Sequence, residues 1–317
     1  MDKTNTDSQE RTDIRRILNS IKHAEKENGG EGYFLDKQSI KAVFDKIPGG
    51  SLDGELARLA MIDGMYSTQM NRRYYALEEL AGNIVELRNI SPKKLEVVFT
   101  DFAKDPGSKD IPNAFTNLWD SSYGIGKYLG DNDEPIEKGV AISLISKYAY
   151  FATEYKFPIY DTIACEVLPL LAKMLKIGGI KGSTLKVKKS GGQRTAGLDT
   201  IKNFIKAINS FKQEYGDNSE DDFYDIFDRL LWYTGKIRRG NLSLILSRTE
   251  YVEWAKMTSS PRNDKAYKNA IETITPEAFM VCLDRNRSKE SKVMLEKLYG
   301  LAQSFGEKKR NKRRRQD

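Results

Sequence analysis

The chain has 317 residues, enough for one large domain or for two lobes that share a core. It contains two cysteines and one histidine, which excludes a disulfide framework, an iron–sulfur cluster, a four-thiolate zinc site and nearly all histidine-based catalysis. Any acid–base chemistry must therefore use Asp, Glu, Lys or Tyr, and we expect neither a metal nor a cofactor. The net charge of +7 suits an acidic partner such as nucleic acid.

The first third of the chain predicts a series of helices. Residues 1–12 are polar and are expected to be disordered. Apolar residues then recur with helical spacing in Asp13–Ala24, Asp36–Phe44 and Leu52–Leu87. In the last stretch the expected core positions are Leu56, Leu59, Ala60 and Met65, followed by Tyr75, Leu77, Leu80, Ile84 and Leu87. A further helix begins at Ser91-Pro92 and is expected to bury Leu95, Val98, Phe99 and Phe102.

Residues 103–136 are rich in Gly, Pro and Asp and are predicted to be loop with helical turns. The segment that follows, from Glu137 to Asp161, is the most distinctive in the chain. A turn at Lys138-Gly139 leads into an apolar helix of about four turns. Pro158 cannot continue that helix and favours extended geometry at Phe157, so Asp161 falls directly before a second apolar helix, Thr162–Leu175. An Asp in that position is either a helix N-cap or a functional carboxylate.

Residues 177–197 form a Gly-rich basic stretch that includes Lys188, Lys189 and Arg194. It is predicted to be a flexible loop with a short extended piece near Leu185 and Val187. Backbone N–H groups and basic side chains in such a loop suit phosphate oxygens, but a solvated linker is an equally good interpretation.

Helices are predicted to resume over Asp199–Tyr215 and from Asp221 to about Tyr233, where Gly235 is the expected C-terminal residue. Further helices reach about Phe305, and residues 306–317 form a basic tail that is expected to be disordered. Strand-like alternation is rare, so the predicted fold is all-α and spans residues 13–305. No signal-peptide pattern and no run of 18 apolar residues is present, and we expect a cytoplasmic protein without a membrane partner.

Three short segments carry a resemblance. Gly139-Val140-Ala141 is followed, after 15 intervening residues, by Phe157-Pro158-Ile159-Tyr160-Asp161, and Tyr66-Ser67-Thr68-Gln69 lies upstream of both. In this order and at about this distance, the segments resemble the helix-hairpin-helix DNA glycosylases, especially the branch that removes adenine opposite oxidised guanine. Ser146-Lys147-Tyr148 and the stretch Trp232–Lys236 also resemble a little-described bacterial group with an oxoguanine-glycosylase-like fold. The resemblance covers roughly Leu52–Lys236.

The resemblance implies a two-lobed, multi-helix domain that binds duplex DNA in base excision repair. Asp161 would be the catalytic carboxylate, Gln69 the wedge that enters the duplex, and an extruded base would stack on Tyr66, Tyr148 or Tyr160. DNA contacts would come from the hairpin region and the basic stretch, namely from Lys138, Gly139, Ala141, Ser143, Lys147, Lys188, Lys189 and Arg194.

The chain departs from the family's pattern in the hairpin region. Lys138 replaces the hairpin's leading proline and Ala141 replaces its second glycine, so a Cβ is added where a phosphate would approach. Ser143 stands where lyase members carry a nucleophilic lysine, which favours a monofunctional enzyme. Lys147 lies one helical turn later and is expected to be a surface or phosphate-facing lysine.

Three functions therefore remain open. The first is a monofunctional DNA N-glycosylase for a damaged or modified base. The second is a nonenzymatic DNA-binding protein with the same fold, and the third is an interaction module of a phage-defence or mobile-element system. DNA is the expected partner in the first two, and the sequence does not identify a protein partner for the third. The protein would be nucleoid-associated, or nuclear in a eukaryote, where the basic tail resembles a nuclear-localisation signal.

Overall fold

The computed structural model describes residues 12–23, 32–66, 68, 70, 73–126, 139–190, 193–195, 197–216, 222–258 and 270–313. Helices dominate these residues and the strands are only two or three residues long, so the prediction of an all-α fold is confirmed. The chain divides into two compact units that alternate along the sequence. Unit 1 comprises Met1–Gly29, Thr162–Gly178 and Ile226–Asp317, and unit 2 comprises Gly30–Asp161 and Gly179–Asp225.

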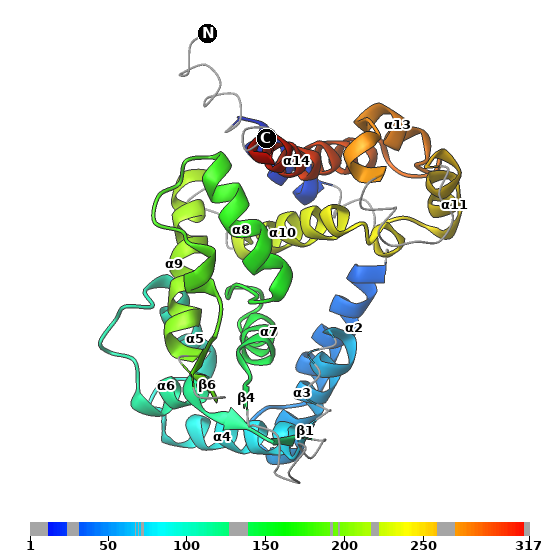
Figure 1. Cartoon of the computed structure of the whole chain (residues 1–317). Coiled ribbons are helices and arrows are strands. Elements are labelled where there is room, and N and C mark those ends of the chain that lie inside the picture. Colours follow the sequence, from blue (N-terminus) through cyan, green and yellow to red (C-terminus); the bar gives the residue numbers. More distant parts are fainter. Residues whose placement is uncertain are drawn as a thin grey trace, which may run out of the picture. The chain divides into compact units, whose positions relative to one another are not determined.

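Unit 2 contains most of the segments predicted to carry function (Figure 1). Its helices are α2 (Gly32–Lys46), α3 (Leu52–Tyr66), α4 (Ala76–Ile90), α5 (Leu95–Lys104), α6 (Asn113–Asp120), α7 (Ile142–Ala152), the 3₁₀ helix η2 (Gly182–Leu185) and α9 (Gly197–Tyr215). Its strands are β1 (Arg73–Tyr74), β2 (Ser122–Tyr123), β3 (Ile125–Gly126), β4 (Gly139–Val140), β5 (Lys188–Ser190) and β6 (Gln193–Thr195). The strands pair antiparallel as β1 with β3, β2 with β4 and β5 with β6.

Two local predictions in unit 2 need correction. The basic stretch is not simply a flexible loop, because it contains η2 and the β5–β6 hairpin. The expected turn at Gly139 is instead strand β4, in which Gly139 pairs with Tyr123 and Val140 pairs with Ser122. A pairing between strands this far apart in the sequence leaves no periodic pattern in either segment, so periodicity could not predict it.

Packed aromatic side chains form part of the core of unit 2. Phe157 is fully buried and stacks on Trp119, with ring centroids 5.9 Å apart and planes 11° apart. It also stacks on Phe102 and meets Phe99 edge to face. Because Pro158 stops α7 from continuing, the chain runs extended through this cluster and fixes the position of Asp161.

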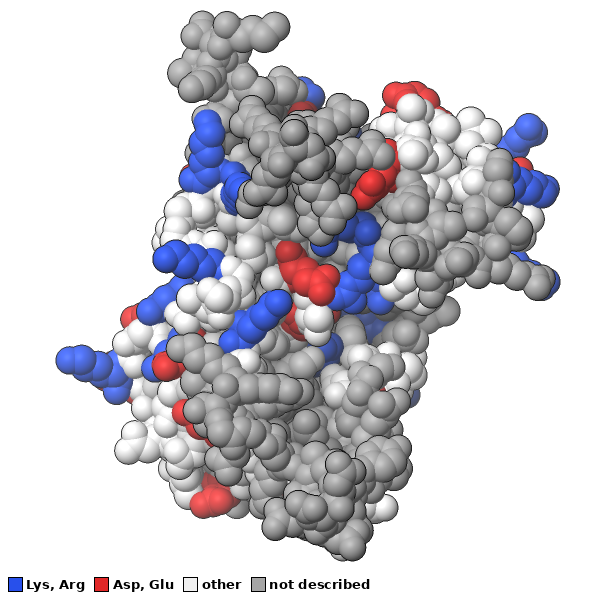
Figure 2. Space-filling model, viewed as in Figure 1, with Lys and Arg blue, Asp and Glu red and all other residues white. Residues whose placement is uncertain are grey.

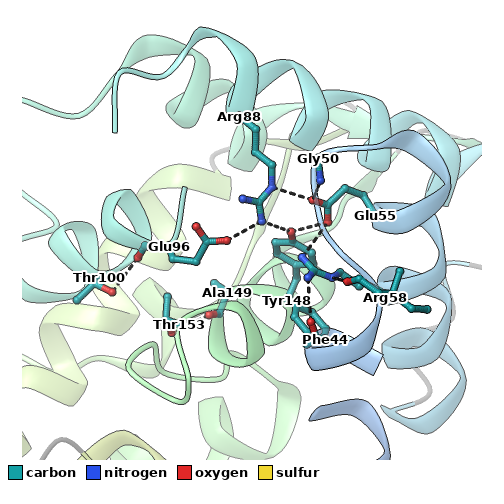
Figure 3. Close-up of polar contacts among 11 residues, drawn as sticks. Phe44, Gly50, Glu55, Arg58, Arg88, Glu96, Thr100, Tyr148, Ala149 and Thr153 are labelled. Atoms are coloured by element: carbon teal, nitrogen blue, oxygen red, sulfur yellow. Dashed lines mark hydrogen bonds and ion pairs between the residues drawn. The ribbon is translucent and has the colours of Figure 1, made fainter. Parts of the chain in front are cut away.

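A buried network of charged and polar side chains lies beside the aromatic core (Figure 3). Glu55 of α3 has no solvent exposure and accepts hydrogen bonds from Arg88 Nε at 2.7 Å, Tyr148 Oη at 2.6 Å and the Gly50 amide at 2.9 Å. Arg88 of α4 also donates to Glu96 at 2.7 Å and to Tyr148 at 3.0 Å. Burial, reinforced by the Glu55 carboxylate, raises the pKa of Tyr148 well above its usual range.

This network corrects the predicted core face of α3. The buried positions are Gly54, Glu55, Arg58, Leu59, Ile62 and Asp63, whereas Met65 is 39% exposed. Apolar periodicity failed here because the buried face carries charges that are satisfied by partners on other elements. Tyr75 is a second correction, since it precedes α4 and is 64% exposed instead of lying in the core. Tyr148 is fully buried, so it is not available to stack on a base.

A second buried ion pair connects α2 to α10 (Phe223–Arg239), whose first residues belong to unit 2. Lys37 Nζ contacts both carboxylate oxygens of Asp225 at 2.6 and 2.7 Å and lies 4.0 Å from the centre of the Tyr155 ring. Tyr150 of α7 donates a hydrogen bond to the same carboxylate. Tyr155 and Glu154 both have positive φ, which confirms the predicted turn after α7.

Unit 1 is built from the helical residues 12–23 together with α8 (Thr162–Met174), the remainder of α10, η3 (Leu242–Leu244), α11 (Arg248–Met257), α13 (Pro276–Val281) and α14 (Lys289–Arg313). The side chains Ile14, Ile17, Leu18 and Ile21 are buried, as their spacing predicts. Trp254, Phe279 and Tyr299 pack together as the centre of the α11–α13–α14 cluster.

Two predicted ends in unit 1 are wrong. Helix α10 continues through Gly235 to Arg239, because the glycine allows a close approach to α8: a Cβ at Gly235 would lie 2.1 Å from Cγ2 of Ile163. Helix α14 runs to Arg313, so the basic tail is not disordered from residue 306 onward. Lys, Arg and Glu are good helix formers and extend an existing helix despite their charge. None of the helices that the structure describes is long and apolar enough to span a bilayer.

Candidate active site

Asp161 is held at the surface of unit 2 by the buried segment that precedes it. Phe157, Pro158 and Ile159 are buried, whereas Asp161 is half-buried and directly precedes the first residue of α8. The sequence placed Asp161 at this helix start. This position, directly before α8, is compatible with both the N-cap interpretation and the functional interpretation.

Ser146 fastens this segment to α7. The Tyr160 amide donates a hydrogen bond to Ser146 Oγ at 3.0 Å, and the same hydroxyl donates to the Ser143 carbonyl at 3.0 Å. Ser146 has no solvent exposure. The Tyr160–Asp161 backbone therefore lies against the turn of α7 that carries Ser143 and Lys147.

Lys147 is a buried lysine, and this corrects the expectation of a surface or phosphate-facing side chain. It is 3% exposed, and its Nζ donates a hydrogen bond to Ser143 Oγ at 2.7 Å. The same ammonium lies 5.4 Å from the centre of the Tyr66 ring, within the range of a cation–π contact. Lys147 thus connects α7 to the end of α3, where the resembling segment Tyr66–Gln69 begins.

The Tyr66–Gln69 segment is anchored by Asp63. The buried Asp63 carboxylate accepts hydrogen bonds from Thr68 Oγ1 and from the Met70 amide, the second at 2.9 Å. Tyr66 is half-buried and contacts Phe151 edge to face. Gln69, the predicted wedge, lies outside the described residues, so the structure places only its neighbours.

Tyr160 is held by the basic stretch. Its hydroxyl donates to the Leu185 carbonyl of η2 at 2.8 Å, and its ring meets Phe204 of α9 edge to face. These contacts hold Tyr160 as a packing residue and connect the Asp161 segment to the chain that leads into β5. The ring is half-buried, so only part of it can meet a base.

The Gly139–Ala141 segment and the β5–β6 hairpin of the basic stretch are neighbours. Strand β6 lies beside β4, and the register of the β5–β6 hairpin sets Lys189 opposite Arg194 and Lys188 opposite Thr195. Ala141 is buried and immediately precedes α7, whose first turn has no side-chain cap. Lys138 lies outside the described residues.

The distribution of described charge is mixed. On the face drawn in Figure 2, Lys and Arg side chains form several separate groups with Asp and Glu side chains between them. The glycines of Gly124-Ile125-Gly126 could offer backbone N–H groups to a phosphate, but the Gly124 amide donates a hydrogen bond to the Glu79 carboxylate at 2.7 Å. A carboxylate therefore already occupies the donor that a phosphate would use.

Sequence reasoning missed Asp63 and the anchoring role of Ser146, the two residues whose hydrogen bonds hold the candidate site together. Asp63 lies in an otherwise apolar stretch of α3, which was the available signal, because a buried carboxylate requires hydrogen-bond donors. Ser146 was named only as part of the resembling segment Ser146-Lys147-Tyr148, and its hydrogen bonds were not predictable, since a serine inside a helix is ordinarily a neutral choice. Comparison of the chain with protein-family models, with curated proteins and with solved structures finds no match.

Proposed function

We propose that the chain binds DNA and hydrolyses the N-glycosyl bond of a damaged or modified base, with Asp161 as the catalytic carboxylate. The observation that supports this most directly is the Ser146 hydroxyl, which holds the Tyr160–Asp161 backbone on the turn of α7 that bears Ser143 and Lys147. Segments that resemble one family of enzymes are thus joined by hydrogen bonds between side chains and backbone.

The proposed chemistry follows from the charge that develops on the sugar. As the C1′–N bond breaks, the base leaves with the bonding electron pair and takes up a proton, and the sugar becomes positively charged. The Asp161 carboxylate stabilises that charge and accepts a proton from the water that adds to C1′. The departing base takes its proton from solvent, and Asp161 returns its own proton to solvent, so the carboxylate is regenerated. The sugar keeps the hydroxyl, and the products are a free base and an abasic site. No covalent bond to the protein is required, which fits Ser143 at the position of the family's lysine.

Lys147 has a supporting role in this proposal. Its ammonium donates to Ser143 Oγ, so the Ser143 hydroxyl is oriented and its own proton is available to an outside acceptor. Ser143 is half-buried, so its hydroxyl can donate a hydrogen bond to a phosphate oxygen or to a water molecule.

The test is the Asp161→Asn variant, which keeps the size of the side chain and removes its charge. We expect base release from duplexes that each contain one damaged or modified base to fall about 100-fold or more, while duplex affinity changes less than twofold. Base release is measured by alkaline cleavage of the abasic product, and affinity by gel shift. Glu154→Gln is the matched control, because it makes the same chemical change at an exposed carboxylate in the turn after α7.

Base release that survives in Asp161→Asn contradicts the proposal. A second candidate function, nonenzymatic DNA binding, is favoured by one observation: Gly139 and Val140 lie in a strand pair where the family has its DNA-binding hairpin. Under that alternative, the wild-type chain binds duplex DNA and releases no base from any substrate in the panel.

A further inference from the structure

Tyr74 and Tyr75 are aromatic residues next to each other in the sequence, and both are exposed on the surface of unit 2. Tyr74 is 55% exposed and Tyr75 is 64% exposed. No other aromatic residue whose surroundings the structure describes is exposed to a comparable degree. The core of unit 2 is rich in aromatic residues, so two consecutive tyrosines that remain in solvent are not explained by packing within this unit.

The backbone holds both residues in fixed geometry. Tyr74 is in strand β1, where it pairs with Ile125 of β3. Tyr75 has φ of 63° and ψ of −1° and directly precedes the first residue of α4. A left-handed conformation is unfavourable for a bulky aromatic residue, and glycine or asparagine is the usual choice there. A residue with a strained backbone and an exposed side chain does not stabilise the core, so it is a candidate for binding a ligand.

The position of the pair connects it to the candidate site. The preceding chain starts at the end of α3, where Tyr66 contacts Lys147 and where Asp63 fixes Thr68 and Met70. Tyr74 follows Met70 closely in the sequence, and two arginines immediately precede the tyrosines. Aromatic rings next to basic residues are the combination that proteins use to bind unstacked bases and the phosphates that flank them.

We propose that Tyr74 and Tyr75 form a platform on which an unpaired DNA base stacks. The proposal rests on the DNA-binding half of the proposed function and is independent of base excision by Asp161. Stacking uses the flat ring faces, which any base can meet, so the platform selects for unpaired bases and not for a sequence. A base left without its partner beside an extruded nucleotide is the natural ligand for such a surface.

The experiment compares a duplex that carries a single bulged 2-aminopurine with a fully paired duplex of the same sequence. The probe's fluorescence reports stacking, and its anisotropy in a labelled version reports affinity. The double variant Tyr74→Thr/Tyr75→Asn is made in the full chain. Threonine suits the strand at position 74, and asparagine tolerates the positive φ at position 75. Ile90→Thr is the matched control, because Ile90 is 56% exposed at the end of α4.

We expect the double variant to bind the bulged duplex about tenfold more weakly and to lose the fluorescence quenching, while its affinity for the paired duplex changes less than twofold. The control should behave as the wild-type chain. The thermal unfolding midpoint of the double variant should be unchanged or higher, since Asn relieves the strain at position 75. A structural role for the tyrosines would lower it.

Two results overturn the platform while leaving the proposed function intact: unchanged binding of the bulged duplex, or an equal loss on both duplexes, which would indicate backbone contacts. A wild-type chain that binds neither duplex overturns both proposals. If that chain instead dimerises, and the double variant is monomeric by light scattering, the exposed rings serve a second copy of the protein and not DNA.

Discussion

Glu55 is fully buried because every strong interaction it needs is supplied from elsewhere in unit 2. Its partners Arg88 and Tyr148 lie 33 and 93 residues away in the sequence. Breaking a buried ion pair from one side leaves the other charge uncompensated, and that loss exceeds the gain from forming the pair.

We therefore expect Glu55→Ala to destabilise unit 2 by about 3 kcal/mol. Trp119 belongs to unit 2, whereas Trp232 and Trp254 belong to unit 1, so the Trp119 signal can be isolated in a Trp232→Phe/Trp254→Phe background. Urea unfolding followed by that fluorescence gives the free energy of unfolding.

The matched control for Glu55 is Asp101→Ala, which breaks the exposed Lys93–Asp101 pair and should cost less than about 1 kcal/mol. Equal losses in the two variants would mean that the network contributes no more than a surface ion pair does.

At the scale of single residues, the sequence predicted the position of Asp161 but not what holds it there. The breaker Pro158 and the following apolar helix are local signals, and they suffice to put Asp161 at a helix start. The bond from the Tyr160 amide to Ser146 and the bond from Thr68 to Asp63 depend on how helices meet. Such contacts arise from the packing of elements, and the spacing of residues along the sequence does not predict them.

At the scale of elements, helices with a regular apolar stripe were predictable, whereas a helix whose extent depends on a close contact with another helix was not. The residues 12–23 and α8 lie where periodicity predicts them, and the apolar positions of α5 are buried as predicted, although this helix begins at Leu95 and not at Ser91-Pro92. Helix α10 was predicted to stop at Gly235, since a glycine after an apolar run resembles a C-terminal signal. Gly235 instead lies inside the helix, where its lack of a side chain allows the close approach of Ile163, and this tertiary contact cannot be read from the local sequence.

This close approach gives a prediction for α10. Gly235→Ala should destabilise unit 1 by about 1–3 kcal/mol, because the added methyl group overlaps Ile163 and the two helices must move apart. Thermal and urea unfolding followed by Trp232 and Trp254 fluorescence measure the change.

Gly300→Ala in α14 is the matched control, because a Cβ there meets no atom within 4 Å and alanine favours helix by about 0.5–1 kcal/mol. If Gly235→Ala also stabilises the protein, α8 and α10 do not approach as closely as described.

At the scale of the whole molecule, charge and chain length are the properties that the sequence states directly. The basic residues of the C-terminal tail lie in Lys308–Arg315, and helix α14 continues into them. If the body of the protein and the tail both contact phosphates, removal of the tail weakens binding without abolishing it.

We expect a chain truncated after Phe305 to bind duplex DNA more weakly and with a shallower dependence on salt. Each lost phosphate contact lowers the slope of log K against log salt by about 0.9. Fluorescence anisotropy titrations at several salt concentrations measure both quantities. An unchanged slope would show that the tail makes no phosphate contact, and complete loss of binding would show that the body makes none.

The alternation of the two units along the chain sets an order of assembly on the ribosome. Unit 2 has all of its residues once Asp225 has emerged, so its core can close while synthesis continues. The N-terminal segment of unit 1 is made before unit 2, yet the largest segment of the same unit, Ile226–Asp317, is made after it. The apolar side chains Ile14, Ile17, Leu18 and Ile21, which are buried in the folded chain, must therefore wait for most of their unit to be synthesised, and in the nascent chain they are a stretch that a chaperone can shield.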